Sequence, residues 1–268
     1  MKPGLLALDF DGVVCDGIDE MVESAWRTLV EVVRAPVALS PELRARFAAL
    51  RPAIETGWEM VVLVGILAER DAASDAELRD APRWASARDE YVRAHAVTPA
   101  ALAAAFDAGR ARWIEKDASG WLARHRFYPG IAAWLRRLVA EGQLVYVVST
   151  KGQPFIEALL AWQGIALPSG RIIGRVVAPG PPRREKWDVL SALAAAHGVA
   201  ASGVWFVEDR LATLLEMRRR APHFPARTFL AEWGYLFRDR DPAAARAAGI
   251  PVLDLARATG PFEGWLSG

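Results

Sequence analysis

Cysteine is almost absent from this sequence, since Cys15 is the only one in 268 residues. A single thiol excludes an internal disulfide, so we expect the chain to work in a reducing, cytoplasmic compartment. Long apolar segments are also missing. The longest apolar run extends only from Met60 to Leu67, whereas a membrane-spanning helix needs about 20 such residues. Strand-like residues begin almost at once, and we therefore predict no signal peptide.

Neither sign of charge is in large excess. The formal net charge of +1 provides no long-range field for nucleic acid or an anionic membrane, so we expect a small partner that is recognised locally. Lysine is scarce beside arginine, and the complete set is Lys2, Lys116, Lys151 and Lys186. The hydrophobic fraction of 53% is ample for one large domain or two unequal ones.

The first strong pattern is an apolar run, residues 5–8, that stops at Asp9 and Asp11. Successive side chains of a strand point to opposite faces, so both aspartates are expected on the same side. Gly12 then lets the backbone turn away. Such a strand end lies where open α/β sheets bind ligands. The alternative is a strand followed by an Asx-turn, which would need only one aspartate.

The sequence falls into two regions with different hydrophobic patterns. From Asp19 to about Arg126 apolar residues recur at helical spacing, whereas from Gly142 onward short apolar strands alternate with helices. The alternation predicts a parallel sheet covered on both faces. Capping hydroxyls before proline predict helix starts at Ser40-Pro41 and Thr98-Pro99. Beyond the first strand, the predicted strands are 144–148, 203–207, 227–231 and 250–253. Residues 156–163 are a predicted helix, and an Ala-rich segment, 242–248, separates the last two strands.

The first strand is separated from its partners by the helical block. The predicted fold is therefore α/β, a Rossmann-like doubly wound parallel sheet with strand one central and an inserted all-helical cap domain. We place the core domain at residues 1–16 and 128–268 and the cap at 17–127, with 127–130 as the return hinge.

Polar side chains follow two of the later strands. After Val148 come Ser149, Thr150 and Lys151, whose hydroxyl and amide groups are donors of the kind that bind phosphate oxygens. A helix N-cap is the alternative for the two hydroxyls. After Val207 come further carboxylates, Glu208 and Asp209.

Lys186 lies between these two motifs, near the start of a predicted helix. Because only four lysines are present, its position beside the motifs makes it a candidate for the site. The alternative is a solvated helix residue.

These motifs resemble those of the haloacid dehalogenase superfamily of phosphoryl-transfer enzymes. The family's Asp-x-Asp-Gly motif matches at Asp9 to Gly12, its hydroxyl motif at Ser149 or Thr150, its lysine at Lys186 with Lys151 as runner-up, and its acidic pair at Glu208-Asp209. The proline usual beside that lysine is absent. A helical insert between the first two motifs is what the family's phosphatases with a helical cap carry. Residues 51–59 and 205–211 also resemble an uncharacterised cyanobacterial-type branch.

The predicted chemistry follows from crowded negative charge. Each close pair of unit charges costs about 4 kcal/mol at an effective dielectric of about 20, so the acids at these strand ends need a cation or protons. Oxygen ligands without histidine or cysteine suit Mg²⁺. The predicted metal-site residues are Asp9, Asp11 through its backbone carbonyl, Glu208 and Asp209. The resemblance implies that Asp209 binds the metal directly and Glu208 directly or through water.

Asp9 is the predicted nucleophile, which would form an aspartyl-phosphate. Asp11 would protonate the leaving oxygen and then activate water. Lys186 would hold the transferring oxygens, together with donors from the hydroxyl motif and the loop amides. The predicted phosphate-binding residues are Ser149, Thr150, Lys151 and Gly12.

Substrate choice is assigned to the cap. Arg51, Glu55 and Trp58 form a polar and aromatic cluster in an otherwise apolar helical block. Arginine there would bind a carboxylate or a second phosphate. A structural salt bridge between Arg51 and Glu55 is the alternative.

The leading functional prediction is a Mg²⁺-dependent phosphatase acting on a small phosphorylated metabolite. A phosphomutase would use the same residues, and a non-catalytic binding protein that has kept the fold is the alternative from another class. Haloacid dehalogenation has no use for the acidic pair. Phosphonate cleavage would need a cap lysine, for which Lys116 is the one candidate.

Overall fold

The computed structural model describes residues 1–34, 37–175 and 185–266. The chain divides into two compact units, Met1–Asp16 with Arg126–Gly268, here the core unit, and Gly17–His125, here the inserted unit. The return to the core unit thus comes at Arg126, whereas the sequence analysis placed it at 128. Among the described residues, no helix is long and apolar enough to cross a membrane.

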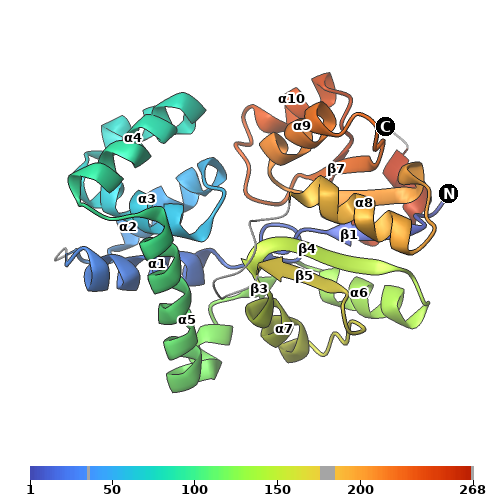
Figure 1. The fold of residues 1–268 in the computed structure, drawn as a ribbon, viewed down its shortest axis with the longest axis horizontal. Coiled ribbons are helices and arrows are strands. Elements are labelled where there is room, and N and C mark those ends of the chain that lie inside the picture. Colours follow the sequence, from blue (N-terminus) through green and yellow to red (C-terminus); the bar gives the residue numbers. More distant parts are fainter. Residues whose placement is uncertain (35–36, 176–184, 267–268) are drawn as a thin grey trace. The chain divides into compact units, whose positions relative to one another are not determined.

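The core unit is built on six parallel strands, β1 (Leu5–Leu8), β4 (Val145–Gly152), β5 (Ile172–Arg175), β6 (Val204–Glu208), β7 (Arg227–Ala231) and β8 (Val252–Leu253). Their order is β5-β4-β1-β6-β7-β8 (Figure 1). Leu6 lies in register with Val145 on one side and Trp205 on the other. Strand one is therefore central, as predicted, and the α/β fold class is confirmed.

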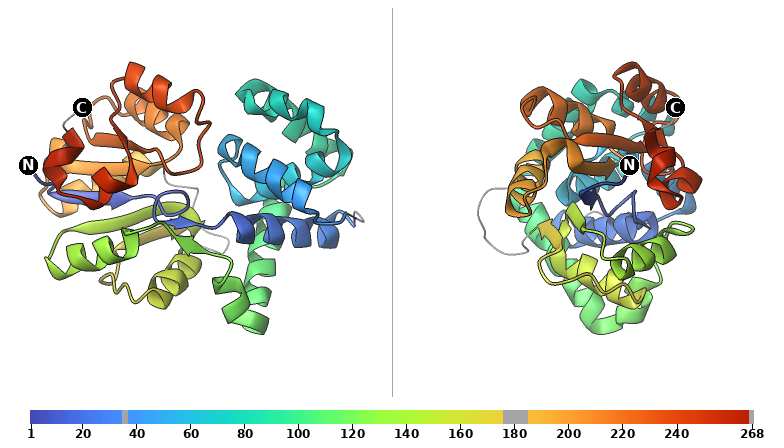
Figure 2. Two further views of the ribbon diagram at one scale, coloured as in Figure 1. Left: turned by 180° about the vertical axis from the view of Figure 1, so that it is seen from behind. Right: turned by 90° about the vertical axis from the view of Figure 1, so that its right-hand side faces the viewer.

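Helices cover both faces of this sheet (Figure 2). On one face, Leu5 and Ala7 join an apolar core with α8 (Lys186–Ala196), α9 (Leu211–Arg220) and α10 (Asp241–Ala247). On the other face, Trp205 contacts Trp265 of the 3-10 helix Phe262–Leu266. The remaining helices of the unit are α6 (Ile131–Ala140), α7 (Gln153–Trp162), α11 (Leu255–Thr259) and the 3-10 helix Ala201–Gly203.

Three strands were not among those predicted from the sequence. β5 was not predicted, because its four residues are only half-buried and lack a strong apolar pattern. A short antiparallel ribbon, β2 (Cys15–Asp16) with β3 (Arg126–Phe127), pairs the two chain segments that lead into and out of the inserted unit.

Within its described residues, 17–34 and 37–125, the inserted unit contains helices and no strand. α3 (Gly57–Glu69) contains the buried apolar run of the sequence and packs against four other helices, which explains why it is apolar all round. Ser40 and Thr98 cap their helices as predicted. The other elements are α1 (Ile18–Val32), α2 (Pro41–Leu50), α4 (Ala81–Ala94), α5 (Pro99–Leu122) and the 3-10 helices Arg51–Ala53 and Ala72–Arg79.

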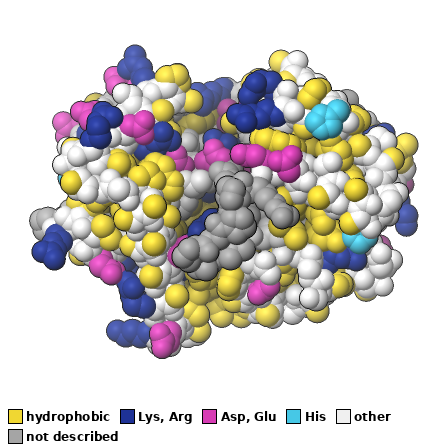
Figure 3. Space-filling view, viewed as in Figure 1, with side chains coloured by type: hydrophobic (Ala, Val, Ile, Leu, Met, Phe, Trp, Pro, Cys, Tyr) yellow, Lys and Arg dark blue, Asp and Glu magenta, His cyan; other side chains and the backbone are white. Residues whose placement is uncertain are grey.

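Both signs of charge occur on the surface of each unit that Figure 3 displays. This mixture agrees with the formal net charge of +1.

Candidate active site

Three adjacent strands bring the predicted motifs to one edge of the sheet. Asp9 follows β1, Ser149 lies near the end of β4, and Glu208 is the last residue of β6. These strands are parallel neighbours, so their carboxyl ends meet at the same edge. The regular strand β1 ends at Leu8, and Asp9 N–H continues the pairing by donating to Val207 O at 2.9 Å.

Lys186 is the ammonium group at the centre of this edge. Its Nζ lies 3.1 Å from Asp9 Oδ2 and 2.6 Å from Glu208 Oε2. Burial alone would lower the pKa of Lys186, but the two carboxylates raise it above its ordinary value. The alternative that Lys186 is a solvated helix residue is wrong, because its side chain is only 9% exposed.

Lys151 is buried as well, but its partner is the other aspartate. Its Nζ lies 3.2 Å from Asp11 Oδ1 and 3.5 Å from Oδ2, and its side chain is completely buried. The two candidate lysines are thus divided between the two aspartates. This arrangement favours Lys186 for the family's lysine motif, since it contacts both Asp9 and the acidic pair.

Three buried carboxylates, from Asp9, Glu208 and Asp209, each have one oxygen within 4.8 Å of the others. Asp9 Oδ1 is buried and has no hydrogen-bond partner among the described residues. Burial raises the pKa of Asp9 to about 6, although Lys186 opposes this shift and Glu208 adds to it. A set of hard oxygen donors with an unpartnered buried oxygen fits a divalent cation such as Mg²⁺.

The two acids of the fourth motif differ in their partners. Glu208 Oε2 accepts from Lys186, and Oε1 accepts from the backbone N–H groups of Asp209 and Arg210 at 3.1 and 3.0 Å. Burial alone would raise the pKa of Glu208, but Lys186 and these donors hold it below its ordinary value. Asp209 Oδ2 accepts from the N–H of Tyr235 at 2.7 Å. Glu208 therefore anchors Lys186, whereas Asp209 and Asp9 are better placed to bind a cation.

Of the two candidate hydroxyls, that of Ser149 contacts Asp9. Its side chain hydrogen-bonds to Asp9 and opposes the rise in the pKa of that carboxyl. Ser149 and Thr150 lie inside β4, and the N-cap of α7 is Gly152. The alternative that these hydroxyls cap a helix is therefore wrong. Phosphate binding by Ser149, Thr150 and Lys151 stays a prediction.

Gly12 occupies a position that only glycine tolerates. Its φ is +84°, and a Cβ built there would lie 1.8 Å from Asp209 Oδ2. The turn after the first motif thus needs glycine both for its backbone angle and for the approach of Asp209.

Arg51, Glu55 and Trp58 belong to the inserted unit. Arg51 is buried, and its Nη1 donates to Ile54 O at 2.9 Å while its Nε contacts Met21 Sδ. Trp58 is half-buried with the Arg88 guanidinium 5.4 Å from its ring centroid. Their role as substrate contacts stays a prediction.

Three further residues, which were not predicted from the sequence, follow β7 and reach Asp209 and the loop after Asp11: Trp233, Gly234 and Tyr235. A signal was present, because an aromatic-Gly-aromatic sequence follows a predicted strand at the ligand-binding edge. It carries no titratable group typical of catalysis and therefore attracted no prediction.

Comparison with known proteins finds similar proteins by structure and none by sequence. No family model matches the chain, and no curated protein does. A predicted phosphoglycolate phosphatase from Haemophilus somnus 129PT is similar, with a TM-score of 0.58 and 15% identity over 88% of each chain. A predicted phosphatase from Clostridium acetobutylicum has a TM-score of 0.57 and 12% identity, over 95% of this chain and 94% of its own.

A haloacid dehalogenase family hydrolase from Deinococcus radiodurans R1, with bound phosphate and sodium, has a TM-score of 0.50 and 16% identity. The match covers 98% of this chain and 97% of that one. At such low sequence identity, the structural similarity establishes the fold, and it does so over nearly the full length of this chain. The chain therefore has the fold of the haloacid dehalogenase-like hydrolases.

Proposed function

We propose that this chain is a Mg²⁺-dependent phosphatase that hydrolyses a small phosphorylated metabolite through an aspartyl-phosphate on Asp9. The observation that carries the proposal is the group of three buried carboxylates, two of which contact Lys186, with Asp9 Oδ1 lacking a hydrogen-bond partner among the described residues. Fold neighbours described as phosphatases, and one with bound phosphate and sodium, support it.

The first half-reaction uses both aspartates. An Asp9 carboxylate oxygen attacks phosphorus, the bond from phosphorus to the leaving oxygen breaks, and Asp11 donates its proton to that oxygen. In the second half-reaction, Asp11 takes a proton from water, the water oxygen attacks phosphorus, and Asp9 and inorganic phosphate are released. The contact with Lys151 holds the Asp11 carboxylate in a defined position.

Lys186 and Ser149 would hold the transferring oxygens and offset the charge that moves through the transition state. Asp9, Asp209 and the backbone carbonyl of Asp11 would hold Mg²⁺, which offsets the phosphoryl charge when bound. Glu208 would keep Lys186 in place through the 2.6 Å ion pair.

We assign substrate selection to the inserted unit, acting as a cap, with Glu55 and Trp58 as its candidate contacts. Arg51 is a weaker candidate, because its guanidinium is buried against Ile54 and Met21. A guanidinium whose Nε and Nη1 already contact neighbouring groups is less available to a ligand.

Phosphate release from a panel of phosphorylated metabolites, measured with Mg²⁺ and with chelator, tests the proposal. We expect release by the wild type in Mg²⁺, and loss of release with chelator and in Asp9→Asn. Isomerisation of a substrate without phosphate release would indicate a phosphomutase instead. No reaction across a broad panel would contradict catalysis and favour a binding protein.

A further inference from the structure

The segment Trp233–Tyr235 of the core unit contacts two parts of the candidate site. It follows β7 and lies against both Asp209 and the loop 12–16, which runs from Gly12 of the first motif through β2. The cluster of buried acids consists of Asp9, Glu208 and Asp209, so the segment lies beside the candidate cation ligands. The contacts therefore indicate a supporting role.

The first contact orients Asp209. The backbone N–H of Tyr235 donates to Asp209 Oδ2 at 2.7 Å, a length typical of a charge-assisted hydrogen bond. A carboxylate held through one oxygen has its rotamer fixed, so the direction of its other oxygen is fixed as well.

The second contact is steric. A Cβ built on Gly234 would lie 2.3 Å from Asp209 Cβ and 2.4 Å from the carbonyl oxygen of Gly12. The backbone at Gly234 thus touches both the metal-site acid and the turn after the first motif. No larger residue fits there unless Asp209 or the turn moves.

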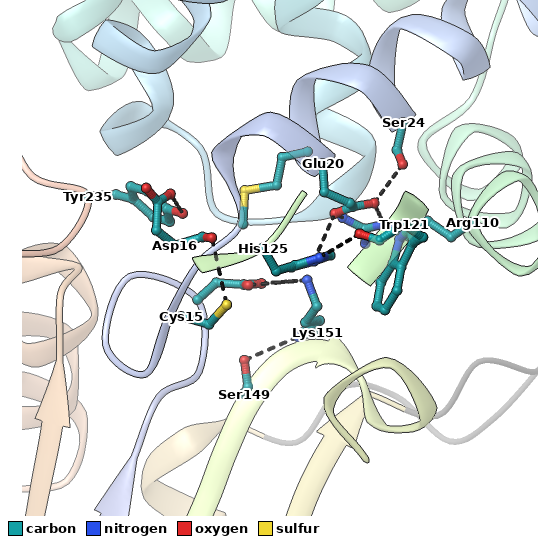
Figure 4. A network of polar contacts seen from close by, with 12 residues as sticks. Cys15, Asp16, Glu20, Ser24, Arg110, Trp121, His125, Ser149, Lys151 and Tyr235 are labelled. Atoms are coloured by element: carbon teal, nitrogen blue, oxygen red, sulfur yellow. Dashed lines mark hydrogen bonds and ion pairs between the residues drawn. The ribbon is translucent and has the colours of Figure 1, made fainter. Parts of the chain in front are cut away.

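The third set of contacts fixes the loop 12–16. Tyr235 Oη donates to Asp16 Oδ1 at 2.8 Å (Figure 4), and Trp233 Nε1 donates to Val13 O at 3.0 Å. Tyr128 adds an edge-on ring contact to Trp233 at 6.4 Å. The segment thereby joins Asp209 to the loop that carries Gly12 and leads to β2.

We propose that Trp233, Gly234 and Tyr235 form a positioning clamp that sets the affinity of the acidic cluster for a divalent cation. The clamp holds Asp209 and the loop 12–16 in one geometry, so that cation affinity depends on residues that do not touch the cation. This inference rests on the cation site of the proposed function.

The test measures Mg²⁺ binding to the full chain by isothermal titration calorimetry, without substrate. Gly234→Ala is expected to weaken binding about 10-fold or more, which is the usual effect of disturbing a supporting residue of a metal site. Gly264→Ala is the matched control, because a Cβ there meets nothing within 4 Å, and it should bind Mg²⁺ like the wild type. Thermal unfolding in chelator checks that both variants are folded.

If Gly234→Ala does not fold, two milder substitutions provide the test. Tyr235→Phe and Asp16→Ala should each weaken Mg²⁺ binding by a similar, smaller factor, and the double variant should be no weaker than either single one. Wild-type binding in Gly234→Ala, or in both milder variants, would overturn the clamp. Failure of the wild type itself to bind Mg²⁺ would instead contradict the cation site and, with it, the proposed function.

Discussion

Each unit of this protein buries a cluster of ionisable side chains, and the two clusters are balanced in different ways. In the inserted unit, Glu20 is completely buried and accepts from Arg110 Nε and Nη2, both at 2.6 Å (Figure 4). Ser24 donates to the same carboxylate at 2.6 Å, and His125 Nε2 lies 3.8 Å away. In the core unit, three carboxylates are buried together, and Lys186 contacts two of them, those of Asp9 and Glu208.

The difference supports the proposal that the Glu20 cluster is structural and the cluster around Asp9 is chemical. A bidentate guanidinium matches the geometry of one carboxylate and leaves little for a ligand to improve. An excess of buried carboxylates with an unpartnered oxygen, as at Asp9, is stabilised only by a proton or a cation. Burial is similar in both clusters, so the balance of charge separates the two roles.

The largest expected effect is a loss of catalytic efficiency when the core-unit cluster loses its ammonium group. Lys186→Met should lower kcat/KM by about 10³-fold or more, because it removes the ammonium that holds the transferring oxygens in the proposed mechanism. Lys116→Met, an exposed lysine of the inserted unit, is the matched control and should leave kcat/KM unchanged. Steady-state kinetics with one accepted phosphate ester measure kcat/KM for each variant. Equal kcat/KM values for Lys186→Met and the wild type would refute a catalytic role for Lys186.

Breaking the balanced cluster should affect stability. Glu20→Gln leaves Arg110 buried without its matched carboxylate and should reduce the free energy of unfolding by about 3–5 kcal/mol. Glu31→Gln, which breaks an exposed pair with Arg112, should cost about 0–1 kcal/mol. Urea unfolding measures both, and equal losses in the two variants would argue against a special role for the Glu20 cluster.

A cation should distinguish the clusters directly. Mg²⁺ at about 100-fold its dissociation constant should stabilise the wild type by about 2.7 kcal/mol. Glu20→Gln should keep this gain, while Asp209→Asn should lose most of it. Thermal unfolding with Mg²⁺ or chelator provides the comparison. A gain that persists in Asp209→Asn would place the cation elsewhere.

The smallest expected effect concerns pH. Burial alone would raise the pKa of Glu23, but hydrogen bonds from Arg27 and Arg44 and the charge of Arg124 lower it below 4.5. A depressed pKa in the folded state stabilises the fold above the unfolded value, and this contribution is lost as pH falls through the folded pKa.

Thermal unfolding of the wild type and Glu23→Gln over about pH 6 to pH 3 measures this contribution. The advantage of the wild type should shrink with acidification below pH 4.5. A constant difference across the range would show that Glu23 contributes by packing alone.

Much of the fold could be predicted because it rests on local patterns. The central strand, the parallel sheet and the hydroxyl caps at Ser40 and Thr98 follow from apolar periodicity and capping chemistry. β5 and the β2–β3 ribbon could not, since two to four half-buried residues carry too little apolar signal. Their pairing is decided by distant parts of the chain.

The candidate site was predictable to the extent that its chemistry lies in strand-end motifs. Asp9, Glu208 and Lys186 come together because parallel strands end at one edge and α8 begins there. The pairing of Lys151 with Asp11 and the contacts of Tyr235 with Asp209 and Asp16 were not predicted. They depend on loop conformations and on a backbone N–H, which residue types alone do not reveal.

Detection of the phosphoenzyme tests the central claim most directly. In Asp11→Asn the nucleophile is retained while water activation is lost, so p-nitrophenyl phosphate with Mg²⁺ should leave a phosphoryl group on the enzyme. After acid quenching, mass spectrometry should find one phosphoryl group on the peptide that contains Asp9, with none in Asp9→Asn. Phosphate release by the wild type together with a phosphoryl group on another residue, or full activity in Asp9→Asn, would contradict the account.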